Sequence, residues 1–535
     1  MLSLHGVHGA LHPPMRGAIL LQRSLQRRWT WLRDALPRPG TLATVLGFAL
    51  AASLGGAVMA TGNLVASGLV LGAILGVLLL NAPALVVWIV LVGTLAITGP
   101  LVMHQPQFAR LAWLFSMLGL FLIVVAVLHA GTARVGMAAA GRTAVRGLRP
   151  PVPGFVMLAV LAMIYAMASM TFSAGPIDEG VSALKRQYQY WGVLFAFAAV
   201  PFTVQQVRGW LRFFLLLALL QLPFALYQRI VLVPLRMNMP NEVVPVDIVA
   251  GTFEGSITGG ANDNVMALFL VCMLIGLLAA RREGLIRDRW LWPLVLIVMA
   301  PMALGETKMV LLLLPLGLGV LYADAARRRP FAFAAGALVT LALVCALFYS
   351  YVALQVDNGR TGMSFRQRFE QNLEYNVGQR GYFGGASLNR GNVLPFWWSR
   401  HGLNDPLGTV FGHGLGSAHG SRGSERLGHI DRRYPGYSIG LTALATQLWE
   451  IGLLGVTLFV AMLAGAWRTA GRLVQQAAPG ADRALCRSLR ATVLLIVPMW
   501  LAMDLLMLAA SLQVIMATIL GLIAWRWRTV PTGAA

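Results

Sequence analysis

Charged residues are scarce in this 535-residue sequence. Asp, Glu, Lys and Arg make up only 12% of it, whereas soluble domains contain about 25%. Hydrophobic residues make up 58%, and the mean hydropathy is +0.71. This balance excludes an ordinary soluble domain and indicates an integral membrane protein. Acidic residues are the rarer sign, and the formal net charge is +22. Membrane topology accounts for that charge, so no nucleic-acid partner is expected.

Lysine and cysteine are also rare. Lys185 and Lys308 are the only lysines, so arginine supplies nearly all of the positive charge. Genome composition produces such a bias, but guanidinium groups also match phosphate geometry better than ammonium groups do. Cys272, Cys345 and Cys486 lie in apolar runs or in a basic connection. They predict neither a disulfide framework nor a cysteine metal site. The Arg-rich start has no short apolar core, so no cleavable signal peptide is expected.

Long apolar runs dominate what is present. A bilayer-spanning helix needs about 20 mostly apolar residues, and lipid-exposed backbone must be helical. The sequence therefore predicts an all-α, polytopic membrane helix bundle of about 12–14 transmembrane helices with one large, partly helical periplasmic loop. The predicted spans lie near residues 42–60, 63–80, 82–102, 112–131, 153–173, 189–206, 208–229, 263–280, 290–304, 307–325, 331–353, 437–466, 490–506 and 507–525.

Basic residues gather in alternate connections, which the positive-inside rule assigns to the cytoplasm. This predicts cytoplasmic termini at residues 1–40 and 527–535. Helices 1–11 then occupy residues 41–353, and helices 12–14 occupy residues 437–526. The polar segment 354–436 becomes an external loop, and long loops cross the membrane regardless of charge.

The long loop is the first candidate for a functional site, because loops carry function more often than their scaffolds. It contains ten arginines and four histidines, namely Arg360, Arg366, Arg368, Arg380, Arg390, Arg400, Arg422, Arg426, Arg432, Arg433, His401, His413, His419 and His429. A basic loop on an apolar body is suited to an anionic substrate. Trp397 and Trp398 would stack on sugar rings, or else mark the membrane interface.

Cations also occur at the outer ends of predicted helices. Arg229 and Arg236 would clamp a lipid-linked pyrophosphate through bidentate hydrogen bonds, or else extend to the lipid headgroups. Glu306 and Lys308 begin another helix, where they are functional candidates or interfacial anchors.

Several familiar chemistries find no support in the sequence. His413, His419 and His429 match no common zinc spacing, so no metal is predicted, although each is a candidate general base. Gly412, Gly414 and Gly416 lack the strand-then-helix context of a dinucleotide site. No GxSxG, HExxH or Walker pattern indicates a hydrolase or an ATPase.

Four segments, in order, resemble the superfamily of O-antigen ligases and Wzy-type polymerases. They are AGTFEGSITGGANDNVMALFL (250–270), ALGETKMVLLLLPLG (303–317), LNRGNVLPFWWSRHGLNDPLGTVFGHGLGS (388–417) and ALATQLWEIGLLGVTLFV (443–460). The chain departs from the family's pattern in one respect. Members commonly carry a His-Asn pair about nine residues before the glutamate that corresponds to Glu450, where this chain has Gly440, Leu441 and Thr442. The departure weakens the ligase interpretation more than the polymerase interpretation.

The resemblance implies a glycosyltransferase of the bacterial inner membrane with its active face in the periplasm. It would polymerise oligosaccharide repeats on undecaprenyl pyrophosphate into exopolysaccharide, capsule or O-antigen, without a cofactor or metal. Membrane lipid and a chain-length-regulating polysaccharide copolymerase are the implied partners. An O-antigen ligase acting on lipid A core, and a polysaccharide transporter or flippase, are the alternatives. The predicted substrate-binding residues are Arg229, Arg236, Lys308, Arg390, Trp397, Trp398 and Arg400, and the predicted catalytic residues are His429, His419 and Tyr437.

Overall fold

The computed structural model of the chain describes residues 75–139, 152–172, 175–239, 245–253, 262–354, 388–419 and 428–530, with a few isolated positions elsewhere. The chain divides into two compact units, residues 1–82 and 83–535. The second unit holds nearly all of the described residues and is the one considered below. The basic segment 1–40, most of the two spans before residue 82 and much of the long loop lie outside the described residues.

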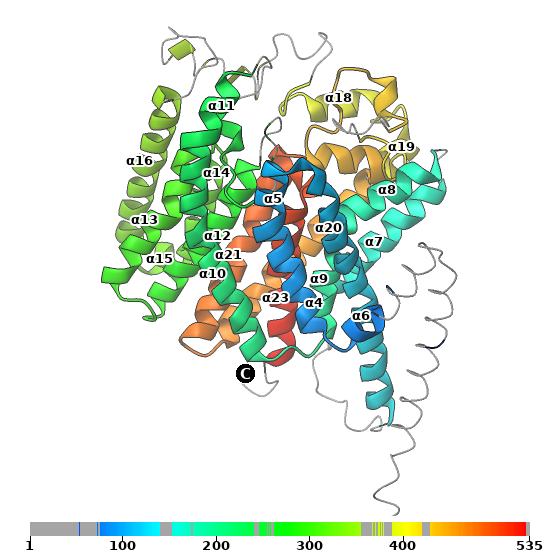
Figure 1. Cartoon of the computed structure of the whole chain (residues 1–535), viewed down its shortest axis with the longest axis horizontal. Helices are drawn as coiled ribbons and strands as arrows, with labels where there is room; N and C mark the ends of the chain where they lie inside the picture. Colours follow the sequence, from blue (N-terminus) through cyan, green and yellow to red (C-terminus); the bar gives the residue numbers. More distant parts are fainter. Residues whose placement is uncertain are drawn as a thin grey trace, which may run out of the picture. The chain divides into compact units, whose positions relative to one another are not determined.

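All regular elements in the described part of the chain are helices, as expected for an all-α protein. The first half (Figure 1) comprises α4 (Pro83–Val92), η1 (Gly93–Ile97), α5 (Thr98–His104), η2 (Pro106–Arg110), α6 (Leu111–Ala139), α7 (Gly154–Phe172), α8 (Ile177–Tyr188), α9 (Trp191–Ala199), α10 (Val204–Tyr227), η4 (Gln228–Leu232), α11 (Val233–Met237) and η5 (Pro245–Ile248). The second half comprises α12 (Asp263–Arg282), α13 (Asp288–Leu304), α14 (Val310–Leu321), α15 (Ala323–Arg328), α16 (Pro330–Leu354), α18 (Val393–Arg400), α19 (Pro406–Phe411), η6 (Asp431–Arg433), α20 (Ala443–Gln476), α21 (Ala481–Ala502), α22 (Leu505–Leu508) and α23 (Ala510–Thr529).

Eight helical stretches among the described residues are long and apolar enough to cross a membrane, which fits a multi-pass membrane protein. Each coincides with a predicted span, although the boundaries differ. The stretches are Pro83–His104, Pro106–Gly131, Gly154–Thr171, Val204–Met237, Asp263–Arg282, Ala443–Gln476, Ala481–Ala502 and Ala510–Thr529.

Some predicted spans form helices that are too short to cross a bilayer. The run at 189–206 forms only the nine-residue helix α9, which lies buried against α6 and α23. The run at 307–325 is divided between α14 and α15. The prediction near 208–229 was too short instead. The helix continues through the π-helical turn η4 into α11, and Pro234 does not end it.

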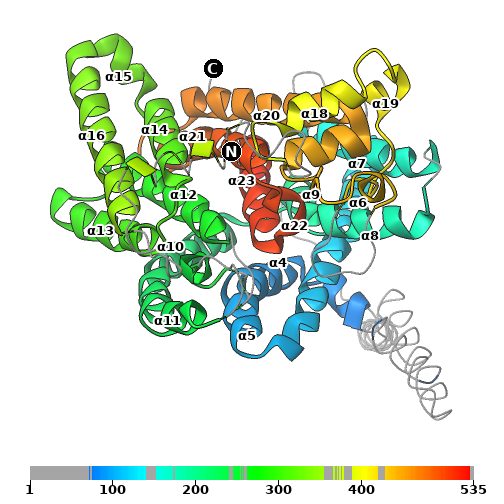
Figure 2. The ribbon, with the colours of Figure 1, turned by 90° about the horizontal axis from the view of Figure 1, so that it is seen from above.

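Helix α23 runs through the middle of the bundle (Figure 2). Every residue from Ala510 to Trp525 is buried, and α9, α20 and α21 all pack against the helix. A helix buried on all sides has no polar face. Its few polar side chains therefore need internal partners, and Gln513 donates to the carbonyls of Arg186 (2.8 Å) and Met507 (3.2 Å).

The two ends of the bundle differ in what they carry. One end has ion pairs between residues of neighbouring helices or directly after them, such as Arg282 with Asp324 and Arg487 with Glu283. The opposite end, here called the loop end, carries α11, α18 and α19 (Figure 1). The candidate functional residues described below belong to elements of the loop end.

Candidate functional site

Helix α10 and its π-helical extension bring Arg229 to the loop end. The guanidinium of Arg229 lies 3.0 Å from a carboxylate oxygen of Glu306, in the connection between α13 and α14. Glu306 adopts a left-handed backbone conformation with φ of 51°, which is unusual for a residue other than glycine. Burial raises the pKa of Glu306 to about 7, against the opposing effect of Arg229. Because π-turns often occur at functional sites, η4 draws attention to this pair.

Arg236, seven residues further on, is a buried cation without a hydrogen-bond partner among the described residues. Its side chain is only 2% exposed, and none of its three guanidinium nitrogens is hydrogen-bonded to a described residue. Asp247 in η5 supplies the opposing charge. Burial raises the pKa of Asp247, while Arg236 and Lys308 act to lower it. A buried charge that lacks hydrogen bonds costs several kcal/mol, roughly, so this arrangement suits an anion that arrives from outside.

Lys308 and Arg390 complete what we call the basic cluster: Arg229, Arg236, Asp247, Glu306, Lys308 and Arg390. Lys308 lies just before α14 and interacts electrostatically with Asp247, Arg390 and Glu306. Burial lowers its pKa. Arg390 precedes α18 and donates to the backbone carbonyl of Ala502 (2.6 Å), at the end of α21, and to the side chain of Asn376. The four predicted cations of the membrane body and the loop therefore belong to one electrostatic network.

Two glutamines that were not predicted as site residues hold the helix that carries the arginines. Gln228 donates to the carbonyl of Gly251 (2.8 Å) and accepts from its N–H (2.7 Å). Gln221 likewise donates to the hydroxyl oxygen of Thr252 and accepts from the Thr252 N–H (both 2.9 Å). The Gly-Thr-Phe segment is thus fixed to α10 and η4. Two amides seven residues apart in an otherwise apolar run were the available signal.

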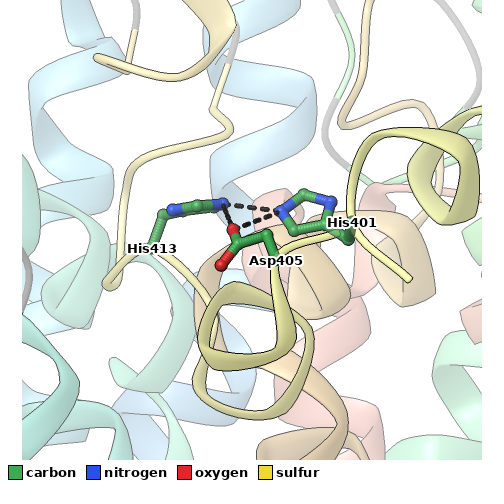
Figure 3. A group of neighbouring side chains, drawn as sticks. All are labelled: His401, Asp405 and His413. Atoms are coloured by element: carbon green, nitrogen blue, oxygen red, sulfur yellow. Dashed lines mark hydrogen bonds and ion pairs between the residues drawn. The ribbon is translucent and has the colours of Figure 1, made fainter. Parts of the chain in front are cut away.

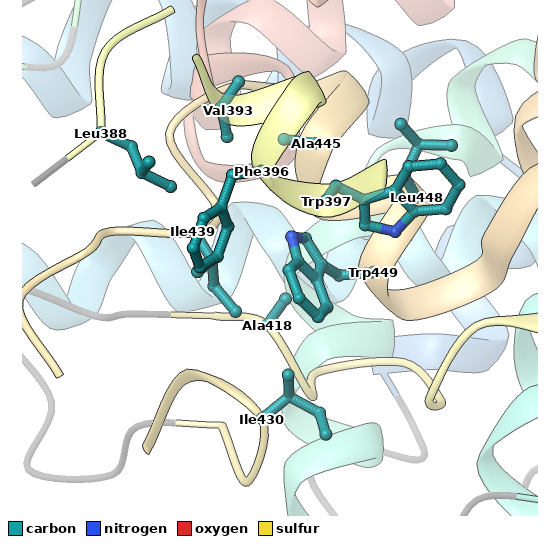
Figure 4. Packing of buried hydrophobic residues seen from close by; sticks show 10 residues of the cluster. All are labelled: Leu388, Val393, Phe396, Trp397, Ala418, Ile430, Ile439, Ala445, Leu448 and Trp449. Carbon is teal, nitrogen blue, oxygen red and sulfur yellow. The ribbon is translucent and has the colours of Figure 1, made fainter. Parts of the chain in front are cut away.

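The aromatic residues of the long loop mostly form a core instead of a surface. Phe396 and Trp397 of α18 and Trp449 of α20 belong to one buried cluster (Figure 4). Trp397 is 4% exposed and stacks on His401, so its ring is not available to a sugar. Trp398 is 55% exposed and keeps a free face. Its place on α18 is compatible with either predicted role.

Arg400 and Tyr437 lie around the same α18 surface. The Arg400 guanidinium lies 5.3 Å from the ring centroid of Phe396 and 5.8 Å from that of Tyr434. Tyr437 stacks on Phe396, with ring centroids 5.1 Å apart. The contacts of both residues are therefore with the aromatic cluster and not with the basic cluster.

The predicted bases His419 and His429 lie near helix α8. His429 Nδ1 is 2.9 Å from a carboxylate oxygen of Glu179, which also accepts from Arg432 (2.9 Å). His419 is partly buried, and burial together with Arg186 lowers its pKa to about 3. His419 is therefore neutral at physiological pH and only weakly basic. Glu179 resembles the orienting carboxylate that commonly accompanies a histidine base.

The other two loop histidines form a close group with Asp405 (Figure 3). His401 Nε2 and His413 Nε2 are 2.6 Å apart, and Asp405 Oδ2 lies 4.0 Å and 3.8 Å from them. Burial lowers the pKa of His413 to about 4. This combination, His-x3-Asp-x7-His, differs from the set of His413, His419 and His429 whose spacing matched no zinc pattern in the sequence.

Glu450 connects α20 to the loop and to α8. Its carboxylate is 1% exposed and accepts a hydrogen bond of 2.6 Å from Gln187. Its backbone carbonyl accepts from Gly414 N–H, and that of Trp449 accepts from His413 N–H, both at 2.9 Å. These backbone contacts are possible because α20 is broken at Gly452, which has φ of 62° and ψ of −169°. Glu450 thus helps to hold the loop against the membrane body.

Comparison with known proteins leaves the family open: no protein-family model matches the chain, and a search of curated proteins gives no significant match.

Proposed function

We propose that the protein is an inner-membrane glycosyltransferase that polymerises undecaprenyl-pyrophosphate-linked repeat units on the periplasmic side of the membrane. The observation that carries the proposal is the basic cluster, and above all the buried, unpartnered guanidinium of Arg236. Arginine recognises pyrophosphate through paired, charge-assisted hydrogen bonds. The cluster lies where helices that cross a membrane end, as access from a lipid requires.

In this reaction a sugar hydroxyl of the acceptor attacks the anomeric carbon of the donor. The bond from that carbon to the pyrophosphate oxygen breaks, and the lipid pyrophosphate leaves with an additional negative charge. Fixed cations stabilise this charge more in the transition state than in the ground state, which is the requirement for catalysis. We assign that role to Arg229, Arg236, Lys308 and Arg390. The acceptor's proton passes to a base on the loop.

His429 is the better base of the two predicted histidines. Its Nδ1 faces Glu179, so its Nε2 is left to accept a proton. His419, with a pKa near 3, would be a weak base at neutral pH. Arg390 joins the loop to the basic cluster, so the loop that carries the base is in contact with the clamp.

Reconstitution in proteoliposomes tests the proposal. Lipid-linked repeat units supplied as the only substrate should become longer lipid-linked chains, with release of undecaprenyl pyrophosphate. Arg236→Gln should abolish both products, whereas Arg366→Gln, which alters an exposed loop arginine, should leave both unchanged. In a deletion strain, single repeats attached to lipid A core indicate a polymerase. Accumulation of lipid-linked polymer with bare core indicates a ligase and would overturn the assignment.

One observation favours a transporter as the second candidate. Helix α20 is broken at Gly452, directly beside the buried Glu450, and broken helices with buried ionisable groups are typical of transporters. A transporter would move lipid-linked repeats across the liposome membrane without lengthening them. The reconstitution experiment separates the two functions, because only a polymerase changes the length of the glycan.

A further inference from the structure

Asp405 uses its two carboxylate oxygens for different purposes. Oδ1 accepts the N–H of Gly408 (2.9 Å) and caps α19. Oδ2 is directed instead toward the two imidazoles, 3.8 Å from His413 Nε2 and 4.0 Å from His401 Nε2. Because the cap satisfies one oxygen, the other remains available as a ligand.

The hydrogen bond of His401 fixes its tautomer. Its Nδ1 lies 3.2 Å from the carbonyl oxygen of Trp397, and a carbonyl only accepts, so Nδ1 carries the hydrogen. The lone pair of Nε2 is therefore directed toward His413. A metal-binding histidine commonly donates its other ring N–H to such a carbonyl.

The surrounding structure holds these groups in place. His401 is 2% exposed, stacks on Trp397 and meets the edge of Trp449, with a centroid distance of 4.5 Å. The N–H of His413 is bonded to the carbonyl of Trp449, and the Thr409 hydroxyl donates to the carbonyl of Gly402 (2.8 Å). The three ligand atoms lie within 4.8 Å of one another.

We propose that His401, Asp405 and His413 bind one divalent transition-metal ion of the zinc type. Zn²⁺ bound at about 2.0–2.2 Å in a tetrahedron separates its ligand atoms by roughly 3.4 Å. The observed separations of 2.6, 3.8 and 4.0 Å lie on both sides of that value, so small rotations of the side chains suffice. Two imidazoles and one carboxylate favour zinc over magnesium or calcium.

The ion would fasten the turn between α18 and α19. All three ligands lie within residues 401–413, a segment whose His413 N–H is docked on α20. The fourth position would face solvent, because Asp405 and His413 are 41% and 25% exposed. Arg433 acts on His413 as a nearby positive group and would reduce the affinity. This proposal does not depend on the glycosyltransferase activity.

Metal analysis of the full chain tests the site. Tag-free protein in detergent is stripped with a chelator, equilibrated with Zn²⁺, separated from free metal and analysed by mass spectrometry. The wild type should retain about one zinc ion per chain. Asp405→Asn, which keeps the cap on α19, and His413→Gln should weaken zinc affinity at least about tenfold. His429→Gln is the matched control, a neighbouring histidine outside the group, and should retain full occupancy.

Two further measurements keep the outcome unambiguous. Co²⁺ in place of Zn²⁺ should give the strong visible absorption of a tetrahedral site in the wild type and in His429→Gln only. Gel filtration and thermal unfolding of the metal-free variants identify any that fail to fold. The proposal is overturned if folded wild type retains no zinc, or if His413→Gln and Asp405→Asn bind it as tightly as the wild type does.

Discussion

At the scale of single residues, Arg236 is the one whose surroundings are least explained by folding alone. A cation that is 2% exposed normally has a full set of hydrogen bonds, and this one has none among the described residues. If Arg236 served only stability, its removal would weaken the fold. If it serves an anion, its removal should mainly affect binding.

Arg236→Gln should therefore separate the two roles. We expect binding of farnesyl pyrophosphate, used as a short lipid pyrophosphate, to weaken by about 10-fold to 10²-fold, because a hydrogen bond to a charged group is worth roughly 1.5–3 kcal/mol. The melting temperature should change little, because Arg236 has no hydrogen bond to lose among the described residues and Lys308 still faces Asp247. Thermophoresis and thermal unfolding in detergent measure the two quantities. A large fall in melting temperature with unchanged binding would assign Arg236 a structural role.

The raised pKa of Glu306 predicts how binding of a pyrophosphate ligand depends on pH. Its pKa is raised to about 7, so it is neutral below that pH and ionised above it. The neutral form leaves Arg229 to the ligand, whereas the ionised form competes for Arg229. Asp247 and Lys308 also act on Glu306, with opposite signs. Affinity for farnesyl pyrophosphate should therefore fall as pH rises through 7, by at most about tenfold per pH unit.

Glu306→Gln isolates this effect from the titration of the ligand itself. The variant should show a smaller decrease in affinity between pH 6 and pH 8, roughly flat apart from the ligand's own titration. Identical pH profiles for the variant and the wild type would mean that Glu306 does not compete for Arg229.

Residue types revealed some of the candidate site, but not its partners. The arginines and the lysine could be recognised in the sequence because they are charged residues next to apolar runs. The structure places them in one electrostatic network. The partners that hold them were not visible, because Gln221 and Gln228 acquire meaning only when the chain returns at Gly251 and Thr252. Likewise, nothing local distinguishes the buried Trp397 from the exposed Trp398.

At the scale of elements, the break in α20 explains how α19 is held. Gly452 has a backbone conformation that residues with a side chain rarely adopt. An added Cβ would also collide with the carbonyl of Val410 in α19. Gly284 also has positive φ, but an added Cβ there would meet nothing within 4 Å. The two glycines therefore share a positive φ, but Gly452, with ψ of −169°, lies in a region that is essentially restricted to glycine, and only there would the added Cβ collide.

Gly452→Ala should displace α19 and lower stability by more than Gly284→Ala does. A positive φ costs about 1–3 kcal/mol in either variant, and at Gly452 the glycine-only backbone region and the collision both add to that cost. Thermal unfolding gives the difference, and protease sensitivity of the loop reports undocking. Equal effects of the two substitutions would show that contact with α19 contributes little.

Helix boundaries were predicted well where a run of apolar residues coincides with a full span, as at Asp263–Arg282. They failed where apolar character reflects burial in protein instead of lipid. Helix α9 is apolar because α6 and α23 cover it, and its nine residues cannot cross a bilayer. Composition does not distinguish these two environments. Polar helix ends such as the start of α21 were missed for the opposite reason.

At the scale of the whole molecule, packing around α23 should be the least tolerant of change. An added Cβ at Gly521 would lie 2.9–3.0 Å from side-chain atoms of Phe197 in α9, whereas one at Gly336 in α16 would meet nothing within 4 Å. Gly521→Leu should abolish the monodisperse gel-filtration peak, and Gly336→Leu should preserve it. A well-folded Gly521→Leu would mean that α9 and α23 separate easily.

The central position of α23 also has a consequence for biogenesis. Among the described helices it is the last to be synthesised, yet it lies in the middle, with Ala510–Trp525 entirely covered. Helices that enter the bilayer earlier must wait with their inward surfaces exposed to lipid, or to a chaperone, until it arrives. The bundle therefore cannot close during translation, and a ribosome that stalls before residue 510 leaves a membrane-inserted intermediate for quality-control proteases to recognise.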